Sequence, residues 1–442
     1  MPSLTSSRIP PEFVHETIRK HMIGDGFPVV VDLRRSHGCW IVDAMNGDEY
    51  LDFYSFFASL PLGFNNPAFH EPENSRRLLD AALHKPSNSD AHTVELAEFV
   101  EAFARQSLQN VFQHLFFVEG GALAVENALK TAFDWKVRKN LRAGRPALGS
   151  QILHFRQAFH GRSGYTLSLT NTQPAKTDYF PKFSWPRVTN PKLRFPIDAS
   201  EVARVADEER QSLEAIREAF LKSPHDIAAI IIEPIQCEGG DNHFRADFLR
   251  ALREVSDEED ALLIFDEVQT GFGLTGRFWA HEHFDVRPDI VSFGKKSQVC
   301  GIMAGPRVDE VPENVFHVSS RINSTWGGNL VDMVRCEMIL EVIQEDRLVE
   351  NAEQVGVYLL ERLRELEGEF PQEVSNSRGR GLLCAFDCPT REERDRLIVR
   401  AREHRLLILP CGDRSIRLRP ALSLSREEAD EAALRIRAAL VD

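Results

Sequence analysis

Short apolar runs alternate with longer amphipathic segments along most of the chain. Residues 261–265 read ALLIF, a run too short for a helix that is ended by two acids, Asp266 and Glu267. A strand buried on both faces has this pattern, because helices cover both faces of a parallel sheet. Four further runs have the same character, and we expect them to join one mostly parallel sheet: 115–118, 151–155, 227–232 and 290–293.

Helical periodicity occupies much of the chain between and after these runs. In residues 93–106, apolar side chains recur every three or four positions, as on the buried face of a helix. The alternation predicts an α/β fold. We also expect helices near 122–136, 208–222, 330–366 and 427–441, a small meander around 29–42, a long loop over 171–195, and C-terminal strands at 379–386, 406–409 and 415–418.

Two of the predicted strands end in side chains of opposite charge. Asp266 follows one run, and Lys295 follows the other after a single glycine. Parallel strands deliver their carboxyl ends to one edge of a sheet, where ligands bind. Pyridoxal phosphate (PLP) uses this pair of groups, because its aldehyde condenses with a lysine and its ring nitrogen needs an acidic partner. Taken alone, the same residues also fit a helix cap or Mg²⁺ ligand beside a solvated lysine pair.

A glycine turn between a strand and a helix predicts a phosphate site. The run 115–118 ends at Gly120-Gly121-Ala122, and a helix follows. Small residues allow close backbone approach, and a helix N-terminus attracts anions. An ordinary tight turn would look the same. The turn matches neither GxGxxG nor GxxxxGK[ST], which disfavours a nucleotide-dependent dehydrogenase or kinase.

Residues 53–64 carry a cluster of aromatic side chains. Such clusters usually fill a core, so we expect most of these rings to be buried. The alternative is that some of them form the wall of a substrate channel. The pattern does not decide between the two.

Composition and charge narrow the range of functions. The 442 residues carry a net charge of −14, which argues against non-specific binding to nucleic acid or anionic membranes. The seven cysteines are scattered and form no CxxC pair, so we expect reduced thiols and no metal site. No apolar run has the length of a signal peptide core or a membrane span. We therefore expect a cytoplasmic protein.

Three blocks of sequence resemble consecutive blocks of one family. IIIEPIQCEGG, LLIFDEVQTGFGLTGRF and PDIVSFGKK are similar to the class III (ornithine and 4-aminobutyrate type) PLP-dependent aminotransferases, and the resemblance runs from about Gly47 to Leu422. It implies fold type I of the PLP-dependent transferases, with a large domain around a mostly parallel sheet and a smaller α+β domain built from both chain ends. The implied boundaries are 1–60 for a segment joining the small domain, 61–330 for the large domain and 331–442 for the C-terminal small domain.

The resemblance also assigns the cofactor residues. Lys295, rather than Lys296, matches the lysine that binds the PLP aldehyde, and Asp266 matches the partner of the ring nitrogen. Thr325 matches a threonine that reaches the PLP phosphate of the neighbouring subunit, which implies a homodimer. The other implied cofactor contacts are Gly121 and Ala122 for the phosphate, Phe159 for the ring face, His160, and Gln269 for the ring hydroxyl.

FYSFFASLPLGFNNPAF and NSTWGGN resemble the branch of the family that acts on the ε-amine of lysine. The implied reaction transfers this amine from L-lysine to 2-oxoglutarate by a ping-pong mechanism and yields 2-aminoadipate 6-semialdehyde and L-glutamate. Ornithine or 4-aminobutyrate as donor is the main alternative, and a non-catalytic PLP-binding protein is a further one. The implied substrate contacts are Arg162 for the lysine α-carboxylate, Arg417 for the second carboxylate of 2-oxoglutarate, Glu238 as a movable acid that neutralises Arg417, and Asn323 and Gln269.

Two points stay open in this comparison. Arg419 lies on the same face of a period-2 strand as Arg417, so the pattern does not tell which one binds the carboxylate. Cys237 stands where the family usually has glycine, which puts the backbone of this loop in doubt.

Overall fold

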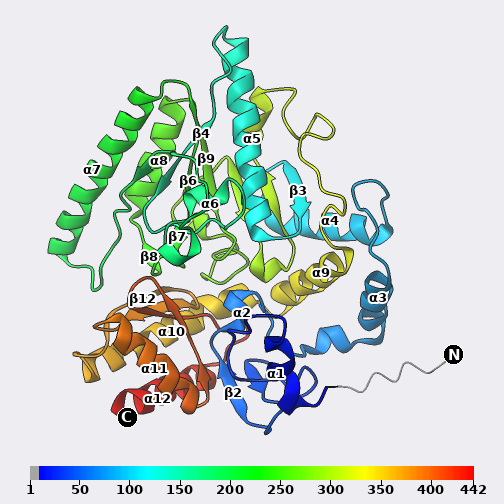
Figure 1. The fold of residues 1–442 in the computed structure, drawn as a ribbon, viewed down its shortest axis with the longest axis vertical. Coiled ribbons are helices and arrows are strands. Elements are labelled where there is room, and N and C mark those ends of the chain that lie inside the picture. The colour runs from blue at the N-terminus through cyan, green and yellow to red at the C-terminus, as the bar shows by residue number, and fades with distance from the viewer. Residues whose placement is uncertain (1–8) are drawn as a thin grey trace.

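A seven-stranded sheet forms the centre of the larger part of the molecule. The computed structural model describes residues 9–442, and its sheet has the order β3-β11-β10-β9-β6-β4-β5 (Figure 1). β11 alone runs opposite to the other six strands, which are parallel to one another. The predicted α/β fold with a mostly parallel sheet is therefore confirmed. The strands are β3 (His114–Val118), β4 (Gln151–Phe155), β5 (Arg187–Val188), β6 (Ile227–Ile232), β9 (Leu262–Asp266), β10 (Ile290–Phe293) and β11 (Cys300–Ala304).

Helices cover both faces of this sheet. Ile231 and Ile264 pack in one apolar cluster with helix α5, whereas Ile230 and Leu263 pack in another with α8. Alternate residues of a strand point to opposite faces, so every position of the central strands is buried. Figure 1 shows α5 on the near face and α7 beside α8. The helices around this sheet are α4 (Val94–Ser107), α5 (Gly121–Arg142), α7 (Ala199–Lys222) and α8 (Ala246–Glu258).

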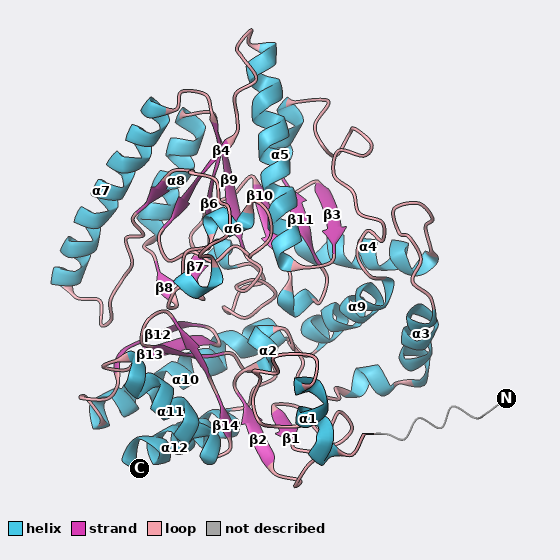
Figure 2. Cartoon of the chain, viewed as in Figure 1, coloured by secondary structure: helices cyan, strands magenta, loops and turns pink. Residues whose placement is uncertain are grey.

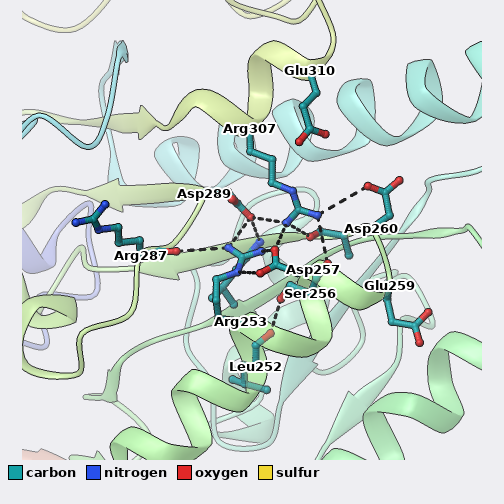
Figure 3. A network of polar contacts seen from close by, with 12 residues as sticks. Leu252, Arg253, Ser256, Asp257, Glu259, Asp260, Arg287, Asp289, Arg307 and Glu310 are labelled. Atoms are coloured by element: carbon teal, nitrogen blue, oxygen red, sulfur yellow. Dashed lines mark hydrogen bonds and ion pairs between the residues drawn. The ribbon is translucent and has the colours of Figure 1, made fainter.

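A polar network fastens α8 to the amino-terminal end of the sheet (Figure 3). Asp289, just before β10, accepts hydrogen bonds from Arg253 at 2.9 Å, from Arg307 at 3.3 Å and from the Leu263 amide at 2.7 Å. The network lies at the edge opposite the carboxyl ends of the strands. It therefore stabilises the scaffold and leaves the other edge free for a site.

The chain ends meet in a second, smaller part of the molecule (Figure 2). Strand β2, from the N-terminal segment, pairs in parallel with β14 from the C-terminal region. This pairing supports the predicted division into 1–60, 61–330 and 331–442, which stays a proposal. The elements are β1 (Trp40–Val42), β2 (Glu49–Asp52), β12 (Ser375–Arg380), β13 (Leu383–Asp387), β14 (Leu406–Leu407), β15 (Leu409–Cys411), β16 (Ser415–Leu418), α10 (Leu348–Glu369), α11 (Arg391–Glu403) and α12 (Arg426–Val441).

Several predicted boundaries were wrong. The single helix expected over 330–366 is two helices, because Arg347 between them adopts a left-handed backbone with φ 53°. The strand expected over 379–386 is a hairpin of β12 and β13, and the loop over 171–195 contains β5. The remaining elements are α1 (Val14–Arg19), α3 (Pro72–Leu83), α6 (Thr166–Leu169), α9 (Leu330–Glu345), the hairpin β7 (Ile235–Gln236) and β8 (Asn242–His243), and short 3-10 turns at Pro11–Phe13, Pro67–His70, Pro174–Lys176, Ala280–His283, Lys295–Ser297 and Pro306–Glu310.

The aromatic cluster divides between core and surface. Phe53 is fully buried, whereas Phe56 and Phe57 are exposed. All four residues of α2 (Ser55–Ala58) have positive φ, between 37° and 66°, so this turn is left-handed. Non-glycine residues rarely adopt this conformation, and here four consecutive residues do. The rings of Phe56 and Phe57 therefore point in directions that a right-handed turn would not give them. Between residues 9 and 442, no helix is long and apolar enough to cross a membrane.

Candidate active site

A cavity of about 490 Å³ opens at the carboxyl edge of the large sheet. Its walls come from the ends of β4, β6, β9 and β10 and from the start of α5. The fold therefore gathers residues that are up to 179 positions apart, from Gly121 to Cys300. Eight predicted residues line the cavity: Gly121, Ala122, Phe159, His160, Arg162, Asp266, Gln269 and Lys295. The other lining residues are Val125, Gly161, Ser163, Glu233, Val268, Thr270 and Cys300.

Asp266 is fixed at the end of β9 by three donors. Its carboxylate lies 2.8 Å from His160 Nδ1 and accepts hydrogen bonds from the Val268 amide and the Ser292 hydroxyl, both at 3.1 Å. The side chain is almost fully buried. A carboxylate held in this way can bind a protonated ring nitrogen without rearranging.

Lys295 and Lys296 have different surroundings although they are adjacent. Lys295 lines the cavity, and its left-handed backbone, with φ 53°, follows directly on Gly294. Burial lowers the pKa of Lys295, while the nearby Asp266 carboxylate opposes this effect. Lys296 Nζ instead donates a hydrogen bond to the Gln269 carbonyl at 3.2 Å, and it does not line the cavity. An amine with a lowered pKa is a better nucleophile and base near neutral pH.

The amino terminus of α5 is shaped to receive an anion. Gly120 caps this helix with φ 107°, and no side chain satisfies the first amide groups. A Cβ atom on Gly121 would lie 3.0 Å from the Val268 side chain, and one on Gly161 would lie 2.6 Å from the Ala122 side chain. The free amides and the close approach suit a phosphate group, and the helix dipole favours its charge.

Glu233 ties two loops of the site together. Its carboxylate, at the end of β6, accepts the Phe159 amide at 3.0 Å and the Cys237 amide at 3.1 Å. Burial raises the pKa of Glu233 to about 7. The sequence analysis did not single out this residue. The available signal was the same one that pointed to Asp266, an acid directly after a buried strand.

Glu238 and Arg417 form an ion pair outside the cavity walls. Glu238 Oε2 lies 2.7 Å from Arg417 Nη2, and the other carboxylate oxygen contacts the Lys176 ammonium. Burial alone would raise the pKa of Glu238, but Arg417 and Lys176 lower it overall. Lys176 was not predicted, and it also lies 5.4 Å from the centre of the Phe159 ring. The pair neutralises a guanidinium that would otherwise attract anions.

The structure separates Arg417 from Arg419, which the sequence pattern did not. Arg419 is fully buried, pairs with Asp241 at 2.5 Å and donates to its own strand's backbone, the Leu418 carbonyl. Arg417 instead pairs with Glu238, which is partly exposed. Both arginines donate to Gln269 Oε1, Arg417 at 3.2 Å and Arg419 at 3.3 Å, so Gln269 connects the cavity wall with both of them. Their acidic partners therefore distinguish the two arginines: Arg419 is neutralised by the fully buried Asp241, and Arg417 by Glu238.

Three predicted substrate or cofactor residues have few partners. Arg162 lines the cavity and is exposed, and within residues 9–442 its guanidinium forms no ion pair. Asn323 and Thr325 are exposed outside the cavity of their own chain. The Thr325 carbonyl accepts a hydrogen bond from the Ser87 hydroxyl at 2.5 Å, which fixes the backbone and leaves the threonine side chain facing outward.

Known proteins resemble this chain over nearly its whole length. The family model described as aminotransferase class-III matches residues 24–440. The chain is 56% identical over 432 residues to the L-lysine-epsilon aminotransferase of Mycobacterium tuberculosis, covering 97% of this chain and 96% of that protein. It is 51% identical to the enzyme of the same name from Streptomyces clavuligerus, covering 95% and 92%. The structure of the lysine aminotransferase from M. tuberculosis in its internal aldimine form superposes with a TM-score of 0.96 at 55% identity, covering 98% of this chain and 99% of that chain.

Proposed function

Because this chain belongs to the class-III aminotransferase family, we propose that it transfers the ε-amino group of L-lysine to 2-oxoglutarate. The products are L-glutamate and 2-aminoadipate 6-semialdehyde, which cyclises. The observation that carries the choice of donor is the Glu238–Arg417 ion pair together with Arg162, which forms no ion pair with any residue from 9 to 442. In this arrangement, Arg162 can bind the carboxylate of lysine, and Arg417 stays neutralised by Glu238 until a dicarboxylate binds.

The residues around the cavity fit PLP as the cofactor. Gly121 and Ala122 at the start of α5 would hold its phosphate, Asp266 its ring nitrogen and Phe159 one face of its ring. His160 holds the Asp266 carboxylate in place, and Gln269 lies within reach as a hydrogen-bond donor. Bound PLP supplies an aldehyde that condenses with amines and a protonated ring that withdraws electrons from the bond to be broken.

Lys295 is the group that moves protons in this proposal. Its amine lies in the buried wall of the cavity, and its lowered pKa favours the neutral, basic form. With PLP bound, Lys295 Nζ would take a proton from the donor carbon of the substrate and return it on the other side of the transferred nitrogen. The Asp266 carboxylate would hold the proton on the ring nitrogen of bound PLP.

Two arginines explain how one pocket accepts both substrates. Arg162 would bind the α-carboxylate of lysine, because a guanidinium holds a carboxylate with two hydrogen bonds. While Glu238 pairs with Arg417, the charge of this guanidinium is neutralised and attracts an anion only weakly. When Glu238 moves away, Arg417 is free for the second carboxylate of 2-oxoglutarate. Asn323 would complete the substrate contacts.

A visible spectrum of the PLP-loaded protein tests this proposal. Addition of L-lysine without a keto acid is expected to convert the yellow absorbance of the loaded protein to that of the pyridoxamine form. Conversion by ornithine or 4-aminobutyrate but not by lysine would replace the donor and keep the reaction class. A colourless protein that takes up no PLP would overturn the whole proposal.

We also propose a homodimer in which Thr325 of one subunit contacts the cofactor phosphate of the other. Its support is that Thr325 is exposed and lies outside its own chain's cavity. Thr325→Ala should weaken retention of PLP. Mixed dimers of Thr325→Ala and Lys295→Ala chains should contain one intact site, so mixing two weak or inactive variants should restore activity. Failure to restore it would contradict the shared site. A cytoplasmic location stays a prediction.

A further inference from the structure

Two histidines and one aspartate converge at the amino-terminal end of the sheet. His114 begins β3, and Asp309 and His317 belong to the segment that follows β11. His114 Nε2 lies 2.9 Å from both carboxylate oxygens of Asp309, and His317 Nε2 lies 3.8 Å from one of them. One ligand atom from each residue lies within 4.8 Å of the other two. Because His114 is far from Asp309 and His317 in the sequence, the cluster does not form a recognisable sequence motif.

The hydrogen bond of His317 turns its Nε2 toward the cluster. His317 Nδ1 lies 3.0 Å from the Pro312 carbonyl, an acceptor, so this nitrogen carries a proton. His317 Nε2 is then the ring nitrogen that faces the Asp309 carboxylate, 3.8 Å away. This separation is too long for a direct hydrogen bond, and a cation between the two groups would join them. A backbone carbonyl behind an imidazole is also the usual arrangement around metal-binding histidines.

Two of the three side chains, His114 and Asp309, are held by packing or hydrogen bonds to neighbouring residues, whereas His317 is exposed. Asp309 Oδ1 accepts a hydrogen bond at 3.0 Å from Asn314, which is itself buried. The His114 ring stacks on Phe316 with centroids 4.7 Å apart and a 13° angle between the planes. Arg307, two positions before Asp309, is fastened by the network in Figure 3. Two of the three ligands therefore need little ordering when an ion binds.

We propose that His114, Asp309 and His317 bind a divalent transition-metal cation of the Zn²⁺ class. Imidazole and carboxylate ligands suit Zn²⁺, and three protein ligands leave the fourth position to water. Around tetrahedral Zn²⁺, ligand atoms about 2.0–2.2 Å from the metal lie about 3.3 Å from one another. The contacts of 2.9 Å and 3.8 Å with Asp309 bracket this spacing, and all three ligand atoms lie within 4.8 Å of one another, so rotations of the two histidine side chains would admit the ion.

The bound cation would cross-link two segments at a distance from the aminotransferase site. Along β3, His114 pairs with Ala304 at one end, and Val118 pairs with Cys300, which lines the cavity, at the other. The four-residue rise from His114 to Val118 places the cluster about 13 Å from the cavity end of the strand. Strand β3 is at the edge of the sheet, and the ion would bridge it to the segment 306–317. Metal binding should therefore raise stability and leave turnover nearly unchanged.

Titration of the tag-free, PLP-loaded protein with Co²⁺ tests the site directly. The expected result is one equivalent of Co²⁺ per chain, visible ligand-field bands of a four-coordinate site, displacement by Zn²⁺ and a higher Tm with Zn²⁺. His317→Gln should weaken binding by at least about tenfold, since even the loss of an outer-shell partner costs 10–100-fold. Transamination by this variant should match that of the unchanged protein.

A matched control separates this site from an ordinary histidine–carboxylate pair. His404 Nε2 lies 2.6 Å from Asp442 with no second histidine, so His404→Gln should leave Co²⁺ binding unchanged. Asp309→Asn should abolish the ligand-field bands. Binding that survives both His317→Gln and Asp309→Asn, or no stoichiometric binding to the unchanged protein, would overturn the proposal.

Discussion

Glu238 accepts a hydrogen bond from Arg417 at 2.7 Å, and the same carboxylate is shared with Lys176. Arg417 is 2% exposed, so this pair is shielded from water and salt. A buried charge that loses its partner is costly, which means that the two residues respond to each other strongly. A change at either residue should therefore leave the other charge uncompensated and alter how the pocket binds its two substrates.

Glu238→Gln should slow the lysine half-reaction selectively. The substitution keeps the shape but removes the charge that neutralises Arg417. Hydrogen bonds to charged groups contribute about 1.5–3 kcal/mol, so kcat/KM for lysine should fall about 10- to 100-fold. The 2-oxoglutarate half-reaction should be nearly unchanged, because it requires Arg417 to be free. Single-turnover spectra with each substrate measure the two rates.

Lys176→Met is the control for this prediction. It removes the other cation bound to Glu238 and leaves the pair with Arg417 intact. Its effect on the ratio of the two half-reactions should be smaller than that of Glu238→Gln. Equal slowing of both half-reactions by Glu238→Gln would show that the acid only supports the fold.

Lys295→Ala should abolish turnover and the yellow absorbance of bound PLP. Lys295 alone of the two adjacent lysines lines the cavity, whereas Lys296 donates to a backbone carbonyl. Lys296→Met should keep the absorbance and measurable activity while lowering Tm, because the Gln269 carbonyl loses its donor. The reverse outcome, with activity lost only at Lys296, would show that the wrong lysine was assigned.

Asp266→Asn should leave PLP bound but reduce turnover. An amide cannot keep the ring nitrogen protonated, and loss of one preorganised electrostatic partner typically costs about 10²–10³-fold in rate. Ser292→Ala removes only one of the three donors to Asp266 and should have a much smaller effect. Normal turnover by Asp266→Asn, measured under saturating PLP, would exclude this role for the carboxylate.

Asp52→Asn should change the pH dependence of stability. Burial raises the pKa of Asp52 from 3.8 to about 6, although the Tyr54 and Ser55 amides donate to its Oδ1. A raised folded-state pKa contributes stability that is present below pH 3.8 and is lost as pH rises through about 6. The rise from 3.8 to about 6, at 1.36 kcal/mol per pH unit, corresponds to about 3 kcal/mol.

The asparagine variant isolates this effect, because its carbonyl oxygen can accept both amides without carrying a charge. Urea denaturation at about pH 4 and about pH 8 should show a decline for the unchanged protein across this window that the variant lacks. Parallel pH profiles for the two proteins would mean that Asp52 is not protonated on folding.

The sequence pattern was sufficient for features that depend on neighbouring residues. An apolar run of five residues is too short for a helix and predicts a buried strand, so the central sheet and the acid at its edge were predicted from the sequence alone. The helix breaks did not follow, because the left-handed backbone of Arg347 has no side-chain signature. The same limit hid the left-handed turn at Ser55–Ala58, where residues that normally avoid positive φ adopt it.

The sequence by itself determined the family, the sheet and the identity of the chemical groups, since strand ends and glycine turns are read from neighbouring residues. Only the tertiary structure decided which groups meet. It distinguished Arg417 from Arg419 by their partners, placed Glu233 between two loops and brought His114 to His317 across 203 positions. Such contacts depend on how segments far apart in the sequence pack against each other, and a local pattern of hydrophobic and polar residues does not specify which distant segments meet.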